Sequence, residues 1–517
     1  MVITRHASVP LVAHISVTAL LDALVDADSF TAWTPEELGI GEQPAVDGEE
    51  YEQELATARQ RSGSAESVDV GSATIDGIPV VVIVSDFAFL AGSVGSVACQ
   101  LVIAAFDRAR TLGLPVFASP SSGGTRMQEG TAAFVLMADV AAAVNRFRAG
   151  GNPLFVWLRN PTTGGVMATW GSLGTVTFGE PDALAGFLGP RVFEMLSGEQ
   201  FPTGVQLTNN LAEHGVIDGV VALPDLRQRV SAVLQVTQSS DTVDANGAPA
   251  TPEVVTAEMP HPDPWDAVVR TRDPSRPTAG TLLAISLTNA TRLVGTGQGE
   301  RSDALGLYLA QWNGIGAVVV AQDRAAQNDG SELGPGALRM ARRGFALAVE
   351  LRLPLITIVD TAGAELSVAA EQGGLAGEIA RCLSELTTLP VPTVSVLLGM
   401  GCGGGALALL PADRVVAAAH AWVSPLPLEG ASVIRYRTPD RAADMARSQR
   451  VAAWQLAESG IVDVVVPEYP DAAQEPEEFC RRVSDTVSTA LVDLISSDAA
   501  KRLSARTARY RGGLDVD

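Results

Sequence analysis

The sequence TLGLPVFASPSSGG at residues 111–124 has a counterpart, ELRLPLITIVDTAG, at residues 350–363. Each stretch contains a short apolar run that ends in a turn of small residues, and each follows a segment of helical character. Short continuous apolar runs that alternate with helices are typical of strands buried on both faces of a sheet. The pair therefore predicts an α/β fold in both halves of the chain.

The same landmarks continue in the same order in each half. A second apolar run leads into glycines in NPLFVWLRNPTTGGVMA (152–168) and in VPTVSVLLGMGCGGGALA (391–408). Each half then closes on a similar phrase, EHGVIDGVVA (213–222) and ESGIVDVVVP (458–467). Three matching landmarks in one order predict an internal duplication. The alternative is two unrelated α/β domains with generic strand–glycine–helix turns.

The stretch between the halves predicts the domain division. Residues 237–263 are polar and proline-rich and have no hydrophobic period, which is typical of a linker. A chain of 517 residues is too long for one core and suits two domains. We therefore expect a first domain at 1–236, a linker at 237–263 and a second domain at 264–517.

Composition and charge exclude several function classes. The net charge of −23 argues against nucleic acid or an anionic membrane as the main partner. No uninterrupted apolar run predicts a membrane span, and no secretory signal begins the sequence, so we expect a cytoplasmic protein. The four cysteines and five histidines lack metal-ligand spacing, so no metal is expected. The one basic stretch, 501–511, predicts a solvated helix or a contact to an acidic neighbouring subunit.

The glycines at the strand-to-helix junctions are the candidate catalytic elements. A backbone without Cβ atoms can direct free N–H groups into a cleft, and a helix N-terminus adds positive potential. An oxyanion hole needs such donors where negative charge develops on an oxygen. The candidates are Gly164 and Gly165 in the first half and Gly404, Gly405 and Ala406 in the second. For either motif alone, close packing of helix on strand is the alternative.

Other catalytic constellations fit less well. Ser121 and Ser122 lack the GxSxG setting of a nucleophile elbow. Arg126 has two open roles, because it could bind a phosphate or carboxylate or tie its turn to a neighbouring strand. Glu129 fits a helix-terminal acid better than a general acid or base.

At these motifs the sequence resembles a known family. SPSSGGTRMQEG, NPTTGGVMATWGSLG and EPDALAGFLGPRV resemble, in that order, the carboxyltransferase β subunit of bacterial acetyl-CoA carboxylase. PWDAVVRTRDPSRPT, ELRLPLITIVDTAGAE and GCGGGALALLPADRV resemble its α subunit. The presence of β-subunit-like and α-subunit-like motifs in one chain is the arrangement of fused acyl-CoA carboxylase β chains. The resemblance covers about residues 20–467 and implies an α/β fold of two tandem crotonase-like (ClpP/crotonase) domains related by duplication.

The resemblance also implies a reaction and residue roles. A carboxyl group passes from carboxybiotin to the enolate of an acyl-CoA such as acetyl-CoA or propionyl-CoA, a step of fatty acid biosynthesis and lipid metabolism. Gly164 and Gly165 would stabilise the thioester enolate, and Gly405 with Ala406 the biotin ureido oxyanion. The acyl-CoA would contact Ser122, Gly123, Gly124, Arg126, Val166 and Gly189, and biotin would contact Gly363, Ala364 and Gly404. No metal is implied.

The implied partners follow from the same resemblance. The sequence has no Met-Lys-Met carrier motif, so biotin is expected on a separate biotin carboxylase or biotin carboxyl carrier subunit. The family site forms between the first domain of one protomer and the second domain of another, which implies a homo-oligomer, either a dimer or a trimer of dimers.

Five residues depart from the family pattern, all in the second half. Ala362, Glu365 and Gly373 stand where Pro, Tyr and Arg are usual, Leu428 replaces a Pro, and Met340 replaces a basic residue. Two alternatives stay open: a decarboxylase of malonyl-type CoA thioesters on the same fold, and a non-catalytic scaffold whose biotin half has decayed. The region 360–374 distinguishes the scaffold from the enzyme.

Overall fold

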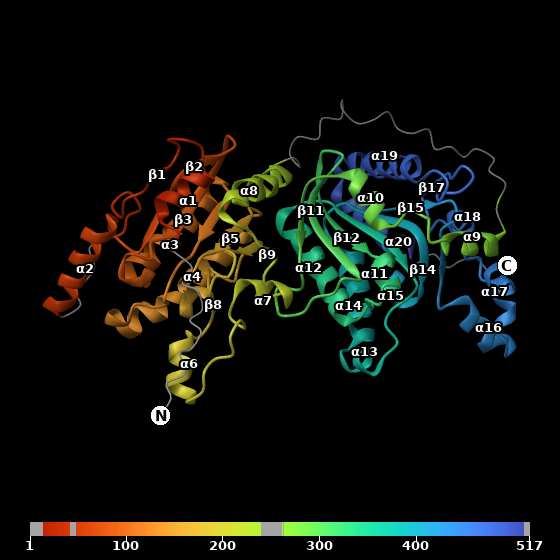
Figure 1. Ribbon diagram of the computed structural model, residues 1–517. Coiled ribbons are helices and arrows are strands. Elements are labelled where there is room, and N and C mark those ends of the chain that lie inside the picture. Colours follow the sequence, from red (N-terminus) through yellow and green to blue (C-terminus); the bar gives the residue numbers. More distant parts are fainter. Residues whose placement is uncertain (1–13, 42–47, 239–260, 262, 511–517) are drawn as a thin grey trace. The chain divides into compact units, whose positions relative to one another are not determined.

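The computed structural model describes residues 14–41, 48–238, 261 and 263–510, and it divides into two compact units (Figure 1). The units are Met1–Leu234 and Gln235–Asp517, and their boundary lies within helix α8 (Leu223–Gln238). Of the predicted linker, only residues 237, 238, 261 and 263 are among those described.

The first unit is built on a seven-stranded sheet. Its order is β1 (Thr31–Ala32), β2 (Val68–Ile75), β3 (Ile78–Ser85), β4 (Val116–Ser119), β5 (Leu154–Leu158), β7 (Val176–Gly179) and β9 (Gly219–Val220). β1 to β3 pair antiparallel, and the strands from β3 to β9 pair parallel. Asp76 and Gly77, both with positive φ, connect β2 to β3, as expected for a two-residue hairpin turn.

The second unit repeats this topology in an eight-stranded sheet. Its order is β10 (Leu287–Leu293), β11 (Leu305–Trp312), β12 (Ile315–Gln322), β13 (Leu355–Thr361), β14 (Thr393–Cys402), β15 (Arg414–Ala418) and β17 (Val464–Val466), with β16 (Trp422–Ser424) beside β14. An Asn313–Gly314 hairpin joins β11 to β12, and parallel pairing follows from β12 onward. The predicted duplication of a crotonase-like α/β domain is therefore confirmed.

Three helices of the first unit have counterparts in the second. α3 (Ser96–Leu112) matches α12 (Pro335–Leu351), α4 (Gly130–Arg148) matches α14 (Leu375–Thr388), and α5 (Gly164–Met167) matches α15 (Gly403–Leu407). The strands they cover are mostly apolar, and residues 80–84 of β3 are almost completely buried. Each buried Val or Ile of such a strand contributes roughly 1.5–3 kcal/mol. Burial on both faces explains the continuous apolar runs of the sequence.

The remaining elements are shorter or lie at the edges of the units. In the first unit they are α1 (Val17–Leu24), α2 (Glu49–Ser62), η1 (Leu90–Gly92), η2 (Met127–Glu129), α6 (Pro190–Ser197), α7 (Thr208–Glu213) and the paired β6 (Thr162–Thr163) and β8 (Ala185–Gly186). In the second they are α9 (Pro264–Thr271), α10 (Ala279–Ser286), α11 (Arg324–Asn328), α13 (Val368–Gln372), α16 (Leu428–Tyr436), η3 (Pro439–Arg441), α17 (Ala442–Ser448), α18 (Ala453–Glu458), α19 (Pro476–Ile495) and α20 (Ala499–Arg509).

One helical stretch, Met127–Arg148, is long and apolar enough by length and composition to cross a membrane. It includes α4, which packs on α3 and buries Met137, Val140, Val144 and Phe147 in the core of the first unit. The core helix of a globular domain passes the same test, so this stretch is weak evidence for a membrane span.

The basic C-terminal stretch contacts the second unit of its own chain, which corrects the expectation of a free helix or a contact to a neighbour. Arg506 of α20 is buried and forms two hydrogen bonds to Asp413. Arg509 pairs with Asp463 in the same way. The sequence could not show this because both acids lie far from α20 in the chain.

Two carboxylates of the first unit accept hydrogen bonds from the same hydroxyl group. Asp69 on β2 and Asp86 after β3 both accept from Ser64 Oγ, at 3.3 and 3.4 Å. Burial, together with the charge of Asp86, raises the pKa of Asp69 from 3.8 to about 6. The folded state therefore binds more protons than the unfolded state between about pH 4 and pH 6, and stability is lost as the pH rises through that window.

We expect Asp69→Asn to raise the free energy of unfolding at about pH 7.5 by roughly 1–3 kcal/mol and to change little at about pH 4. Denaturant unfolding at the two pH values measures this. Asp26→Asn is the control of opposite sign, because hydrogen bonds from Thr74 and Gly77 lower the pKa of Asp26. A destabilised Asp69→Asn at neutral pH would contradict the prediction.

Candidate active site

The first predicted glycine turn packs against the loop that follows β4. Ser122 pairs with Thr162 across the two segments, and its Oγ accepts the N–H of Gly124 at 3.0 Å. Gly124 has φ +114° and Gly164 has φ +65°, in the region that favours glycine. A Cβ atom added at Gly164 would lie 3.0 Å from the Cα of Gly124. Both motifs therefore need glycine for backbone-to-backbone contact.

Gly165 is the second residue of α5, and the first N–H groups of a helix have no intrahelical acceptor. A Cβ atom added at Gly165 would lie 2.9 Å from Thr125 Oγ1 and 3.4 Å from Met137 Cγ, so these two side chains line the space beside it. Val166, the next residue, is completely buried. The turn thus places helix N–H groups in a closely packed, buried setting, where backbone donors can stabilise charge that develops on an oxygen.

Most N–H groups of the loop that follows β4 already have hydrogen-bond acceptors within the first unit. Gly123 donates to the carbonyl of Ala91, and Gly124 donates to Ser122 Oγ, each at 3.0 Å. Val94 forms two backbone hydrogen bonds to the residues that flank Thr125. Its carbonyl accepts from the N–H of Arg126, and its N–H donates to the carbonyl of Gly124. The N–H of Thr125 therefore faces away from Val94. The sequence interpretation did not include Thr125 among the candidate site residues, although Thr125 directly follows the SSGG motif.

The contacts of Arg126 are those of the structural role, in which Arg126 ties its turn to neighbouring segments. Its guanidinium is buried, pairs with Glu66 and Glu129, and donates to the carbonyl of Ser93 at 2.8 Å. Glu129 accepts the N–H of Ser96 at 2.6 Å and so satisfies the N-terminus of α3. A contact of Arg126 to substrate stays a prediction. Gly189 lies apart from this network, at the start of α6.

The second glycine turn has the same local construction. Thr361 Oγ1 accepts the N–H of Gly363 at 3.1 Å, as Ser122 does for Gly124. Gly363 has φ +134° and Gly403 has φ +67°, close to the values of Gly124 and Gly164. The N–H of Ala364 would lie 3.1 Å from a Cβ atom at Gly405. The predicted biotin-contact residues Gly363, Ala364 and Gly404 therefore lie together.

These matches make Gly403 the structural counterpart of Gly164 and Gly404 that of Gly165. Gly405 and Ala406, the predicted donors, lie two residues further into α15 and are buried. The sequence could not show this offset, because three consecutive glycines do not indicate which one adopts positive φ. Gly403 is thus a second residue that the sequence interpretation missed, and the roles of Gly405 and Ala406 stay predictions.

Comparison with known proteins identifies the family. The model of the carboxyl transferase domain matches residues 45–501 of the chain. The chain belongs to the carboxyl transferase family. A probable biotin-dependent acyl-coenzyme A carboxylase beta3 subunit of Mycobacterium tuberculosis is 50% identical over 499 residues, which cover 96% of this chain and 98% of that protein. The resemblance noted in the sequence is confirmed: the chain is a carboxyltransferase of the biotin-dependent acyl-CoA carboxylase family.

More distant relatives of this carboxyl transferase have the same organisation. The acetyl-coenzyme A carboxylase carboxyl transferase subunits beta/alpha of Salinispora arenicola are 34% identical over 515 residues, 96% of this chain and 90% of that protein. The fold matches transcarboxylase 12S, solved as a hexamer with methylmalonyl-coenzyme A bound, with a TM-score of 0.71 at 19% identity. That match covers 93% of this chain and 90% of the transcarboxylase chain.

The departures from the family pattern divide into core and loop residues. Met340 and Leu428 are completely or almost completely buried, so they belong to the core of this carboxyl transferase. Gly373 packs against Pro335, and a Cβ atom there would lie 2.9 Å from that ring. Its carbonyl accepts from Arg339 Nη2 at 2.6 Å. Ala362 is exposed, and Glu365 and Gly373 are partly exposed.

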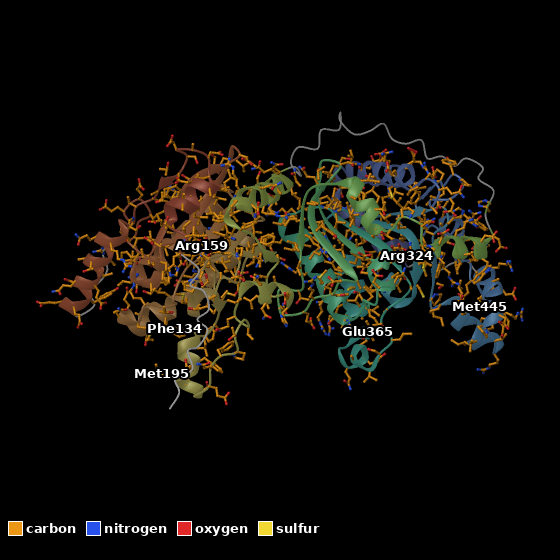
Figure 2. The ribbon with its side chains drawn as sticks, viewed as in Figure 1. Phe134, Arg159, Met195, Arg324, Glu365 and Met445 are labelled. Carbon is orange, nitrogen blue, oxygen red and sulfur yellow. The ribbon has the colours of Figure 1, made fainter. Side chains whose placement is uncertain are left out.

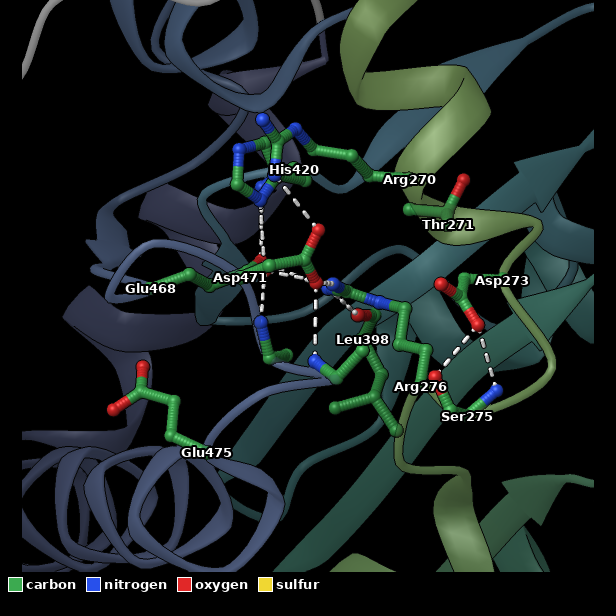
Figure 3. Close-up of polar contacts among 12 residues, drawn as sticks. Arg270, Thr271, Asp273, Ser275, Arg276, Leu398, His420, Glu468, Asp471 and Glu475 are labelled. Carbon is green, nitrogen blue, oxygen red and sulfur yellow. Dashed lines mark hydrogen bonds and ion pairs between the residues drawn. The ribbon is translucent and has the colours of Figure 1, made fainter.

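One buried cluster in the described part of the chain has the geometry of a metal site. The ligand atoms of His420, Glu468 and Asp471 lie within 4.8 Å of one another (Figure 3). Arg276, however, donates to both Glu468 oxygens at 2.7 and 2.8 Å and lies 3.6 Å from Asp471. Burial raises the pKa of Glu468, but the hydrogen bonds and charges of Arg276 and His420 outweigh it and hold that pKa well below its usual range. The guanidinium already provides the positive charge that these carboxylates need.

Proposed function

We propose that the chain transfers a carboxyl group from carboxybiotin, carried on a separate subunit, to the α-carbon of acetyl-CoA or propionyl-CoA. The observation that supports this most is the pair of glycine turns, each packed on its own small-residue loop in topologically equivalent units. Carboxyl transfer generates negative charge on two oxygens, one on the thioester and one on the ureido group. Two equivalent sets of backbone donors match that requirement.

In the first unit, the N–H groups of Gly165 and Val166 are the proposed donors to the thioester oxygen, because the N–H of Gly164 already donates to the carbonyl of Phe187 at 2.9 Å. They are fixed before the reaction by the contact of Gly164 with Gly124, so little reorganisation accompanies the development of charge. Gly165 has no side chain that would stand between its N–H and an approaching thioester oxygen. Loss of one such donor typically costs about 10²–10³ in turnover.

In the second unit, the N–H groups at the start of α15 are the proposed donors to the biotin ureido oxygen. The chemistry of this donor set fits the group, because a ureido oxygen needs hydrogen-bond donors and no charged partner. Carboxybiotin, when bound, supplies the carboxyl group. The intact backbone of this turn, with Met340 and Leu428 in the core, favours an active site over the scaffold alternative.

We also propose that the active protein is a homo-oligomer in the cytoplasm. Large apolar side chains are exposed in both units, among them Phe134 at 63% and Met195 at 84% in the first (Figure 2) and Leu366 at 93% in the second. We propose that contacts with another protein cover these side chains. A second copy of this chain is the proposed partner, and the transcarboxylase of the same fold was solved as a hexamer.

Reconstitution tests the proposed function. The purified chain is mixed with a biotinylated carrier, a biotin carboxylase, ATP and radiolabelled bicarbonate, and we expect acid-stable label in the malonyl-CoA or methylmalonyl-CoA formed from acetyl-CoA or propionyl-CoA. A parallel reaction with malonyl-CoA and no carrier tests the decarboxylase alternative. Failure on every short-chain acyl-CoA, with intact oligomers, would exclude the proposal.

A further inference from the structure

Gln322, the last residue of β12, joins the two backbone segments that form the second glycine site. Its Nε2 donates to the carbonyl of Gly405 at 2.7 Å, and its Oε1 accepts the N–H of Asp360 at 3.2 Å. The side chain is completely buried. Both contacts agree on one orientation of the amide, because the reverse orientation would oppose donor to donor and acceptor to acceptor.

The carbonyl of Gly405 needs such a partner. α15 ends after one turn, and the N–H groups that follow it bond the carbonyls of Gly404 and Ala406. A buried carbonyl without a partner costs about 1–3 kcal/mol, so the amide of Gln322 stabilises this position of the turn. It also fixes the peptide plane between Gly405 and Ala406, because that plane is rigid.

The second turn needs more external support than the first. It contains three consecutive glycines, whose backbone has the greatest freedom of any residue, whereas the first turn has two glycines followed by the buried Val166. The counterpart of Gln322 at the end of β3 is Ser85, since Asp86 and Asp323 make equivalent backbone bonds to the preceding strand. Within the described residues, Ser85 Oγ has no hydrogen-bond partner.

The other end of the Gln322 amide is held firmly as well. Asp360 accepts the N–H of Met400 at 3.0 Å and Arg324 Nε at 3.1 Å. Arg324 is almost completely buried in the second unit (Figure 2). Met400 belongs to β14, the strand that leads into the glycine turn. Gln322 and Asp360 thus form a buried frame around the turn, with one contact on each side of it.

We propose that Gln322 is a positioning residue that holds the second glycine turn in the orientation needed to bind the biotin ureido oxygen. This inference rests on the proposed function and extends it to one side chain. Gln322 acts through the backbone, so its loss changes the biotin side of the reaction and leaves the acyl-CoA side intact.

The test compares Gln322→Met with Ser85→Ala, the matched change at the equivalent position of the first unit. Initial rates are measured with the biotinylated carrier and with acyl-CoA as the varied substrate. Gln322→Met is expected to lower kcat and to raise the KM for the carrier by about 10-fold each, since it removes a buried hydrogen-bond contact. The KM for acyl-CoA should stay within about twofold, and Ser85→Ala should match the unmodified chain in every constant.

Two further measurements keep the outcome decisive. Gln322→Glu restores both hydrogen bonds only while the carboxyl group is protonated, so its rate should rise as the pH falls, relative to the unmodified chain. Amide hydrogen exchange across residues 403–407 should be faster in Gln322→Met, and this readout does not depend on activity. Kinetics and exchange identical to Ser85→Ala would overturn the inference, whereas an inactive unmodified chain would overturn the proposed function instead.

Discussion

Gly165→Val is expected to lower the turnover of acyl-CoA carboxylation by about 10²-fold or more while the fold persists. Gly165 has no positive φ, so a side chain there causes no backbone strain, in contrast to Gly164. Its Cβ would lie 2.9 Å from Thr125 Oγ1 and 3.4 Å from Met137 Cγ, so these two side chains must shift by a few tenths of an ångström to admit it. The valine would therefore cover the donors that the thioester oxygen must approach, at the cost of a local adjustment of Thr125 and Met137.

Gly280→Val is the matched control, because a Cβ there would have Thr278 Oγ1 at 3.6 Å as its nearest neighbour. Gly404→Val tests the second turn, where the Cβ would lie 2.9 Å from Ile379 Cδ1. Steady-state kinetics and thermal unfolding are measured for all three. Unchanged turnover in Gly165→Val would remove this turn from the proposed oxyanion site, and a loss equal to that of Gly280→Val would show a general effect on folding.

The sequence was sufficient for those features that depend on neighbouring residues. Apolar runs such as 355–359 follow from local patterns, and the structure has a strand there. The duplicated order of strands and glycines predicted the topology, because a repeated pattern folds into a repeated unit. Local chemistry also located Gly164 at the strand-to-helix turn, since only two glycines follow the strand there, and its role as a donor stays a prediction.

Features that depend on distant residues could not be predicted in the same way. The role of Arg126 depends on Glu66, some 60 residues earlier, which the sequence does not connect to it. The position of Gln322 depends on three strands that meet at one edge of the sheet, so no motif marks it. The offset between Gly403 and Gly405 depends on where α15 begins, and helix ends are hard to place when every candidate residue is glycine.

Arg506→Met is expected to destabilise the second unit by about 3–5 kcal/mol, because it removes one partner of a buried ion pair. Arg506 donates to both oxygens of Asp413, at 2.9 and 2.6 Å, and neither side chain is more than about 1% exposed. Its remaining donors bind the carbonyls of Leu386, Leu389 and Val391. In the variant, the buried carboxylate of Asp413 and the three carbonyls lose the donors of Arg506. Methionine replaces only the apolar packing of the arginine side chain.

The measurement is denaturant unfolding followed by a tryptophan of the second unit, and the matched control is Arg481→Met. Arg481 pairs with Glu477 and Glu478 at the surface of α19, and exposed pairs contribute only about 0–1 kcal/mol. The double variant Arg506→Met with Asp413→Asn should recover part of the loss, because it removes a buried carboxylate whose remaining charged partner is Arg502, at 3.4 Å. Equal stability of Arg506→Met and Arg481→Met would mean that α20 is not anchored by this pair. The basic terminal stretch would then return to the role of a solvated helix that its sequence alone suggested.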